Sequence, residues 1–119
     1  MIHALKQLPE YFDSVVFGEK GFEVRKNDRP FRVGDLLALN EWDAEIERYT
    51  GRSCLVYIDY ILNDEAYCKE GYVILGIKPC EVMAYNNLVR VNPLSNRGTY
   101  AVLLATEIDE DYVRLKNGN

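Results

Sequence analysis

Apolar and polar residues alternate in several short stretches of this chain, and this period of two is typical of β-strands. The clearest stretch is 52–62, in which every second side chain would point to the same face. Residues 36–42 and 72–77 are almost continuously apolar, which is typical of strands buried on both faces. The predicted strands are 2–6, 21–26, 36–42, 52–62 and 72–77, with a further hairpin formed by 82–91 and 99–106.

One segment near the N-terminus has helical spacing instead. Phe12 and Val15 lie three positions apart and would face the same side of a helix over residues 8–18. Pro9 fits the first helical turn, where its missing N–H costs nothing. Gly18 is placed where a helix commonly ends in a left-handed residue. We therefore predict a single helix that leads directly into the second strand.

These elements predict a mainly β fold with a small α component (α+β). We expect a small β-barrel or strongly curved sheet with the N-terminal helix packed at one end. An open two-layer α+β sandwich is the alternative. Residues 43–51 are polar and contain a Thr-Gly pair, so we expect a mobile loop there. With 119 residues, the chain has the length of one domain, covering residues 1–119.

The charge of the chain is unevenly distributed. The net charge of −5 argues against a general nucleic-acid coat protein, because such proteins are usually basic. Residues 18–34, however, contain five cations and three carboxylates, so a locally basic site lies on an acidic body. Such a site suits a nucleotide or a short RNA better than a long duplex. The sequence contains no apolar run of membrane-spanning length and no secretory signal, so we expect a cytoplasmic protein without a membrane partner.

Little metal or redox chemistry is expected. The three cysteines, Cys54, Cys68 and Cys80, are widely spaced and form no Cys-x-x-Cys pair, and His3 is the sole histidine. We predict reduced thiols packed as small hydrophobic side chains, with no metal site and no cofactor.

The strand that follows the helix carries the most informative residues. In an extended strand Phe22 and Val24 share one face, while Glu23 and Arg25 share the other. We expect the apolar pair to enter the core and the charged pair to stand on a surface or a cleft wall. Lys20 is close enough along the chain to lean over the charged face.

These charged residues have the chemistry to hold a nucleotide. Arg25 could bind a phosphate through two hydrogen bonds, and Lys20 could supply a second positive charge. Glu23 could accept hydrogen bonds from the amino group of a base. The alternative is an ordinary surface ion pair, which would contribute less than about 1 kcal/mol.

Three further residues are candidates for the rim of such a site. Arg29 and Arg52 would extend its basic edge, and Tyr49 could stack on a base. The alternative for the arginines is simple solvation, which is usual for lone arginines on exposed loops.

Gly18, Lys20, Glu23 and Arg25 fit the pattern Gly-x-Lys-x-x-Glu-x-Arg, which resembles the signature of ASCH domains in the PUA-like superfamily. Over residues 1–78 the chain also resembles a family of uncharacterised bacterial and phage proteins related to ASCH domains. The segments that carry this second resemblance are Leu5-Lys6, Pro9-Glu10-Tyr11-Phe12, Phe22 to Arg29, Val33-Gly34-Asp35 and Tyr49-Thr50-Gly51-Arg52. The resemblance implies a PUA-like β-barrel with a cleft beside the helix-to-strand junction, and a role in binding RNA or a nucleotide.

The resemblance also suggests a catalytic alternative. One ASCH-type branch hydrolyses acetylated cytidine with a lysine, a nucleophilic threonine three residues later, and a glutamate. Here Glu23 occupies the position of the threonine, and a carboxylate between two cations is a weak base near neutral pH. We therefore assign no catalytic residue, although a hydrolase acting on a modified nucleoside would have to use Lys20 and Glu23. A protein-interaction domain without a ligand is the third alternative.

Overall fold

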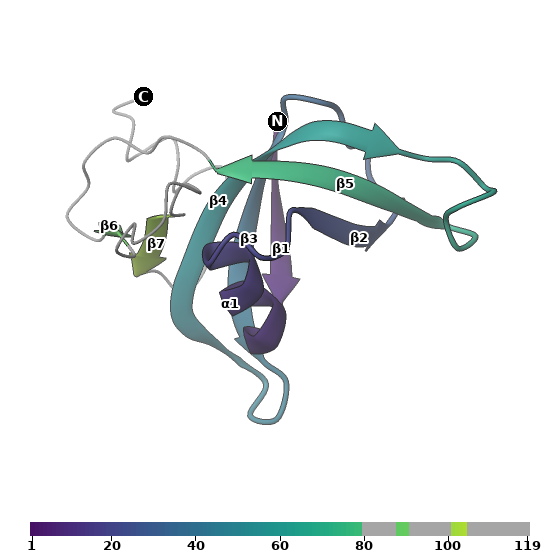
Figure 1. The fold of residues 1–119 in the computed structure, drawn as a ribbon. Helices are drawn as coiled ribbons and strands as arrows, with labels where there is room; N and C mark the ends of the chain where they lie inside the picture. Colours follow the sequence, from purple (N-terminus) through teal and green to yellow (C-terminus); the bar gives the residue numbers. More distant parts are fainter. Residues whose placement is uncertain (80–87, 91–100, 105–119) are drawn as a thin grey trace.

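The computed structural model describes residues 1–79, 88–90 and 101–104 (Figure 1). In chain order their elements are β1 (Ile2–Gln7), α1 (Pro9–Val16), β2 (Phe22–Lys26), β3 (Leu36–Asp43), β4 (Arg48–Leu62), β5 (Tyr72–Pro79), β6 (Leu88–Arg90) and β7 (Ala101–Leu104). The predicted helix and all five strands predicted before residue 80 are therefore confirmed. Strands β6 and β7 pair antiparallel, as the predicted C-terminal hairpin requires, while the rest of that hairpin lies outside the described residues. No helix in the described part of the chain is both long and apolar enough to cross a membrane.

The strands form a curled half-barrel in the order β1-β3-β4-β5-β2 (Figure 1). Strand β1 runs parallel to β3, and the other neighbours in this order are antiparallel. Strand β4 is long enough to pair with β3 along its first part and with β5 along its last part, and β7 pairs with its residues 52–54. The sheet thus confirms a mainly β fold with one short helix. Among the described strands, β1 and β2 end this order, so the half-barrel has an open seam between them.

Helix α1 packs against the concave face of the sheet and completes the core (Figure 1). Its Phe12, Val15 and Val16 are almost fully buried, as expected from their helical spacing. The strand residues that join them in one apolar cluster are Leu5, Leu37, Leu39, Cys54, Val56, Ile58, Val73, Leu75 and Ile77. Because these residues alternate along each strand, the concave face is apolar over most of its area.

The end of α1 fixes the start of the charged segment that leads into β2. Gly18 has a φ of +74°, which a residue without a Cβ adopts easily. Its N–H donates to the carbonyl of Val15 at 2.9 Å, and the N–H of Glu19 donates to the carbonyl of Ser14 at 2.9 Å. This pair of bonds is a Schellman motif. The N–H of Lys20 also donates to Ser14, at 3.0 Å, so the turn holds Lys20 against the end of the helix.

The prediction of a mobile loop over residues 43–51 is wrong. Strand β3 extends to Asp43 and β4 begins at Arg48, so the turn consists of residues 44–47. Asp43 Oδ1 accepts the N–H of Glu45 at 2.9 Å, a contact typical of tight turns that begin with an aspartate. Residues 43–51 are polar because they form the tip of a hairpin that extends beyond the core.

Candidate functional site

The charged cluster predicted around β2 is assembled, but the faces of the strand are reversed. Glu23 is 1% exposed, whereas Phe22 and Val24 are 47% and 50% exposed, so the prediction that the apolar pair enters the core is wrong. Strand β2 pairs with β5 in a register that places Glu23 opposite Leu75. Directly paired residues point to the same face of a sheet, and Leu75 belongs to the core. The alternation of side chains along β2 was therefore predicted correctly, but the wrong face of the strand was predicted to be buried.

Three side chains surround the buried carboxylate of Glu23 with N–H donors. Gln7 Nε2 donates to Oε1 at 2.8 Å and to Oε2 at 2.7 Å. Arg25 donates to Oε1 from Nε at 3.2 Å and from Nη2 at 2.8 Å. Lys20 Nζ donates to Oε2 and, at 2.6 Å, to the carbonyl of Phe22. These contacts occupy the lone pairs of the carboxylate and offset the cost of burying its charge.

The cluster lies at the open seam of the half-barrel. Gln7 is the last residue of β1, and Glu23 is the second residue of β2. Their contact therefore joins the two end strands through side chains, where no backbone ladder is recorded between them. Gln7 is itself only 6% exposed.

A hollow of about 770 Å³ opens beside this cluster, between the start of α1 and β2. The aromatic rings of Tyr11 and Phe22 line it, and both are about half exposed. Lys20 Nζ lies 5.7 Å from the centroid of the Tyr11 ring and 5.1 Å from that of Phe22. Lys6 and Glu19 also line the hollow. Together with the Glu23 cluster, the lining contains three cations and two carboxylates, so its net charge is positive.

Comparison with known proteins places this region in a single family. Residues 2–77, which run from β1 into β5, match it. The chain belongs to the family described as Domain of unknown function (DUF3850). It is also similar to the "Uncharacterized 12.9 kDa protein in GpA 3'region" of Escherichia phage P2, with 39% identity over 74 residues. That match covers 62% of this chain and 65% of the phage protein, so the chain spans slightly less than two thirds of its relative.

Arg52, predicted at the rim, does not line the hollow of this DUF3850 domain. Its Nε and Nη2 donate to Oε1 and Oε2 of Glu41 at 2.8 and 2.6 Å, and Nη2 also donates to Asp13 Oδ1 at 2.9 Å. Burial alone would raise the pKa of Glu41, but the hydrogen bonds from Arg52 and Thr50 hold it below its ordinary value. The guanidinium also lies 4.8 Å from the centroid of the Phe12 ring. Arg52 thus ties α1 to β3.

Arg29 and Tyr49 are likewise placed outside the lining of the hollow. Arg29 pairs with Asp28 at 3.8 Å on the exposed segment after β2. Tyr49 packs edge-on against Trp42, with ring centroids 4.9 Å apart. Lys6 Nζ lies 3.7 Å from the centroid of the Trp42 ring. The two aromatic rings thus lie near Lys6, which lines the hollow, but they do not line the hollow themselves.

Most other residues of the hollow were not predicted as site residues, and Gln7 and Tyr11 matter most among them. Gln7 continues the alternation set by His3 and Leu5, which are both buried, so its inward direction could have been read from the pattern. Tyr11 lies on the first turn of α1 without a comparable signal. Its place beside Lys20 depends on how the helix packs.

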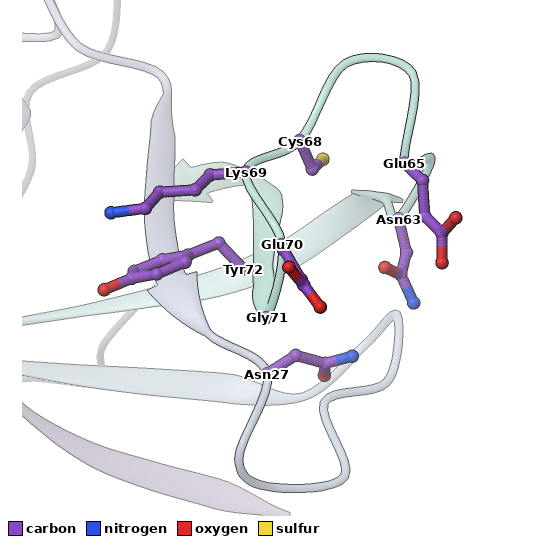
Figure 2. A pocket seen from close by; sticks show the side chains of 8 residues that line it. All are labelled: Asn27, Asn63, Glu65, Cys68, Lys69, Glu70, Gly71 and Tyr72. Carbon is purple, nitrogen blue, oxygen red and sulfur yellow. The ribbon is translucent and has the colours of Figure 1, made fainter.

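A second hollow of about 490 Å³ lies at the loop between β4 and β5 (Figure 2). Figure 2 shows the side chains of Asn27 and Asn63 pointing toward one another across it, while Lys69 runs alongside the ring of Tyr72. Lys69 Nζ lies 5.2 Å from the centroid of that ring. None of the side chains lining this hollow is buried, and no ion cluster fixes them. The first hollow is therefore the better candidate for a site in the DUF3850 domain.

The described cysteines are reduced thiols. Cys54 is buried, and Cys68 is partly exposed with its Sγ 3.3 Å from the carbonyl of Leu62. Cys80 lies outside the described residues. Within the described ranges, no group of three or more His, Cys, Asp or Glu side chains is arranged to hold a metal ion.

Proposed function

We propose that the hollow beside Glu23 binds a nucleotide or a short single-stranded segment of RNA. The observation that carries this proposal is the surplus of donors and positive charge. Lys20 and Arg25 share a single carboxylate, and Arg25 uses only two of its five N–H groups on it. Its remaining N–H groups have no acceptor among the described residues, so they are free to bind a phosphate or a base carbonyl.

The aromatic rings at the rim support the same ligand class. Tyr11 and Phe22 present half-exposed rings on either side of Lys20 Nζ. Stacking of a base on an aromatic ring contributes about 1–3 kcal/mol and does not depend strongly on the base. The volume of the hollow also lies within the range of about 300–1,000 Å³ that is usual for small-ligand sites.

The resemblance to ASCH domains is part of this proposal. Lys20, Glu23 and Arg25, which carry the resemblance, form the ion cluster, and Gly18 shapes the turn that places Lys20. We therefore propose that the half-barrel is PUA-like and that its motif residues build the binding site.

The two alternatives receive less support. A hydrolase would need Glu23 to accept a proton, yet its lone pairs are occupied by Gln7, Lys20 and Arg25. A protein-interaction domain that had lost its ligand would be expected to fill the cleft with its own side chains, whereas this hollow is open.

Fluorescence anisotropy with a labelled ten-nucleotide RNA of mixed sequence tests the proposal. We expect the wild-type affinity to fall as salt rises, because binding neutralises phosphates. Lys20→Ala and Arg25→Ala should each weaken binding by roughly 10-fold at constant salt. Arg29→Ala is the matched control, because it removes a nearby cation that does not line the hollow, and its affinity should equal that of the wild type.

Circular dichroism and thermal unfolding establish that each variant is folded before its affinity is compared. Folded Lys20→Ala and Arg25→Ala variants that bind RNA as tightly as the wild type would refute the proposal. Turnover of acylated cytidines by the wild type, lost in Glu23→Gln, would favour the hydrolase instead.

A further inference from the structure

We infer that Gln7 determines the specificity of the hollow, and that the preferred base carries an amino group beside a ring-nitrogen acceptor, as adenine and cytosine do. This inference rests on the proposed function and goes beyond it, because charge and stacking alone would accept any base.

The amide of Gln7 has a fixed orientation. Its Nε2 lies 2.8 and 2.7 Å from the two oxygens of Glu23. A carboxylate oxygen accepts hydrogen bonds only, so the amide group facing Glu23 must be the NH₂. The amide oxygen, Oε1, is therefore directed away from Glu23.

Among the described residues, this oxygen is an acceptor without a partner. Gln7 is only 6% exposed and lines the hollow. Within the described part of the chain, no N–H or O–H group donates to Gln7 Oε1. A buried acceptor of this kind favours a ligand that supplies a donor, and it penalises a ligand that presents a second acceptor at the same place.

Donors lie next to this acceptor. Gln7 Nε2 and Arg25 Nη2 both bind Glu23 Oε1, each at 2.8 Å, so one carboxylate oxygen holds the two side chains side by side. We expect the remaining N–H groups of Arg25, which have no acceptor among the described residues, to lie beside Gln7 Oε1. The pair offers an acceptor and a donor to a ligand, and the complementary ligand has a donor beside an acceptor.

The Watson–Crick edges of adenine and cytosine have this arrangement, with an exocyclic amino group beside an unprotonated ring nitrogen. Uracil and hypoxanthine carry a carbonyl in place of the amino group. The role expected of Glu23 from the sequence, accepting a base amino group, thus passes to Gln7. Glu23 is a positioning residue that orients the amide.

The test compares matched pairs of ten-nucleotide RNAs by fluorescence anisotropy: oligo(A) against oligo(I), and oligo(C) against oligo(U). Within each pair an amino group is replaced by a carbonyl, and the ring nitrogen beside it changes from an acceptor to an N–H donor. We expect the wild type to prefer the amino member of both pairs by roughly 10-fold, the effect of one buried hydrogen bond. Gln7→Met keeps the length of the side chain without its acceptor, so its two ratios should fall by several-fold, and any preference that remains comes from the donors of Arg25. Lys20→Ala should weaken binding of all four RNAs and leave the ratios unchanged.

The outcomes separate this inference from the proposed function. Wild-type protein that binds all four RNAs equally overturns the inference and leaves nucleotide binding in place. A preference that is as large in Gln7→Met as in the wild type overturns the assignment to Gln7. Wild-type protein that binds none of the RNAs overturns both proposals. If Gln7→Met fails to fold, the wild-type ratios still test the base preference, because equal binding of all four RNAs overturns the inference.

Discussion

Replacing Glu23 by glutamine should lower the free energy of unfolding by about 3 kcal/mol. The substitution keeps the size of the side chain and removes its charge. It also replaces one oxygen by an NH₂ group, which then faces the N–H groups of Gln7 and of either Lys20 or Arg25. At least one attractive contact thus becomes a contact between two donors.

The magnitude follows from how deeply each member of the cluster is buried. Leaving a fully buried charge without its partner costs about 3–5 kcal/mol. The side chains of Lys20 and Arg25 are 17% and 21% exposed, so both cations can regain some solvent when Glu23 is neutralised. We therefore expect the lower end of that range, near the strength of one or two hydrogen bonds to a charged group.

Urea unfolding at neutral pH, followed by the fluorescence of the sole tryptophan, Trp42, would measure this effect. Glu19→Gln is the matched control, because Glu19 lines the same hollow but is exposed. Its expected change is within about 0.5 kcal/mol. A loss of less than about 1 kcal/mol in Glu23→Gln would refute the view that the cluster is a tightly paired part of the fold.

Two further predictions concern charges elsewhere in the domain. Arg52→Met should lower the free energy of unfolding in chemical denaturation by about 2–3 kcal/mol, because it leaves Glu41 buried without a cation. Arg48→Met, on the exposed part of the same strand, should leave the stability unchanged. Equal stability of the two variants would contradict the pairing of Arg52 with Glu41. Acid should also destabilise the fold. Burial alone would raise the pKa of Asp35, but the hydrogen bond with His3 at 2.8 Å helps to hold this pKa below its ordinary value. The pKa of Glu41 is likewise held below its ordinary value. A carboxyl whose pKa is lowered in the folded state stabilises the protein above its unfolded-state pKa, and this contribution is lost as the pH falls. The urea midpoint of the wild type should therefore drop between about pH 5 and 3, and the midpoint of Asp35→Asn should drop less steeply. An equal dependence of the midpoint on pH in the two proteins would contradict this prediction.

The elements of this fold could be predicted because their signals are local. The helix is bounded by Pro9 and Gly18, and its buried residues recur at helical spacing. The strands follow from alternation or from continuous apolar runs. The loop was predicted to be longer than the observed turn at 44–47, because polarity alone does not distinguish a loop from the exposed end of a hairpin.

The burial of β2 could not be predicted in the same way. Alternation shows that Glu23 and Arg25 share a face, but it does not show which face is inside. That choice depends on the pairing of β2 with β5 and on Gln7, which lies 16 residues before Glu23 in the sequence. A buried carboxylate becomes acceptable only when such partners are in place. Local hydrophobicity therefore predicted the burial of Phe22 and Val24, whereas tertiary contacts bury Glu23 on the opposite face.

The ion cluster at the seam is the part of this fold that stability alone explains least. Apolar side chains of similar size could pack against Leu75 and join β1 to β2, often with equal or greater stability than a buried ion pair. They would supply neither the donors of Arg25 nor the amide oxygen of Gln7, which have no partner among the described residues, to the lining of the hollow. A ligand that binds these groups would account for a charged cluster where folding requires only a filled seam.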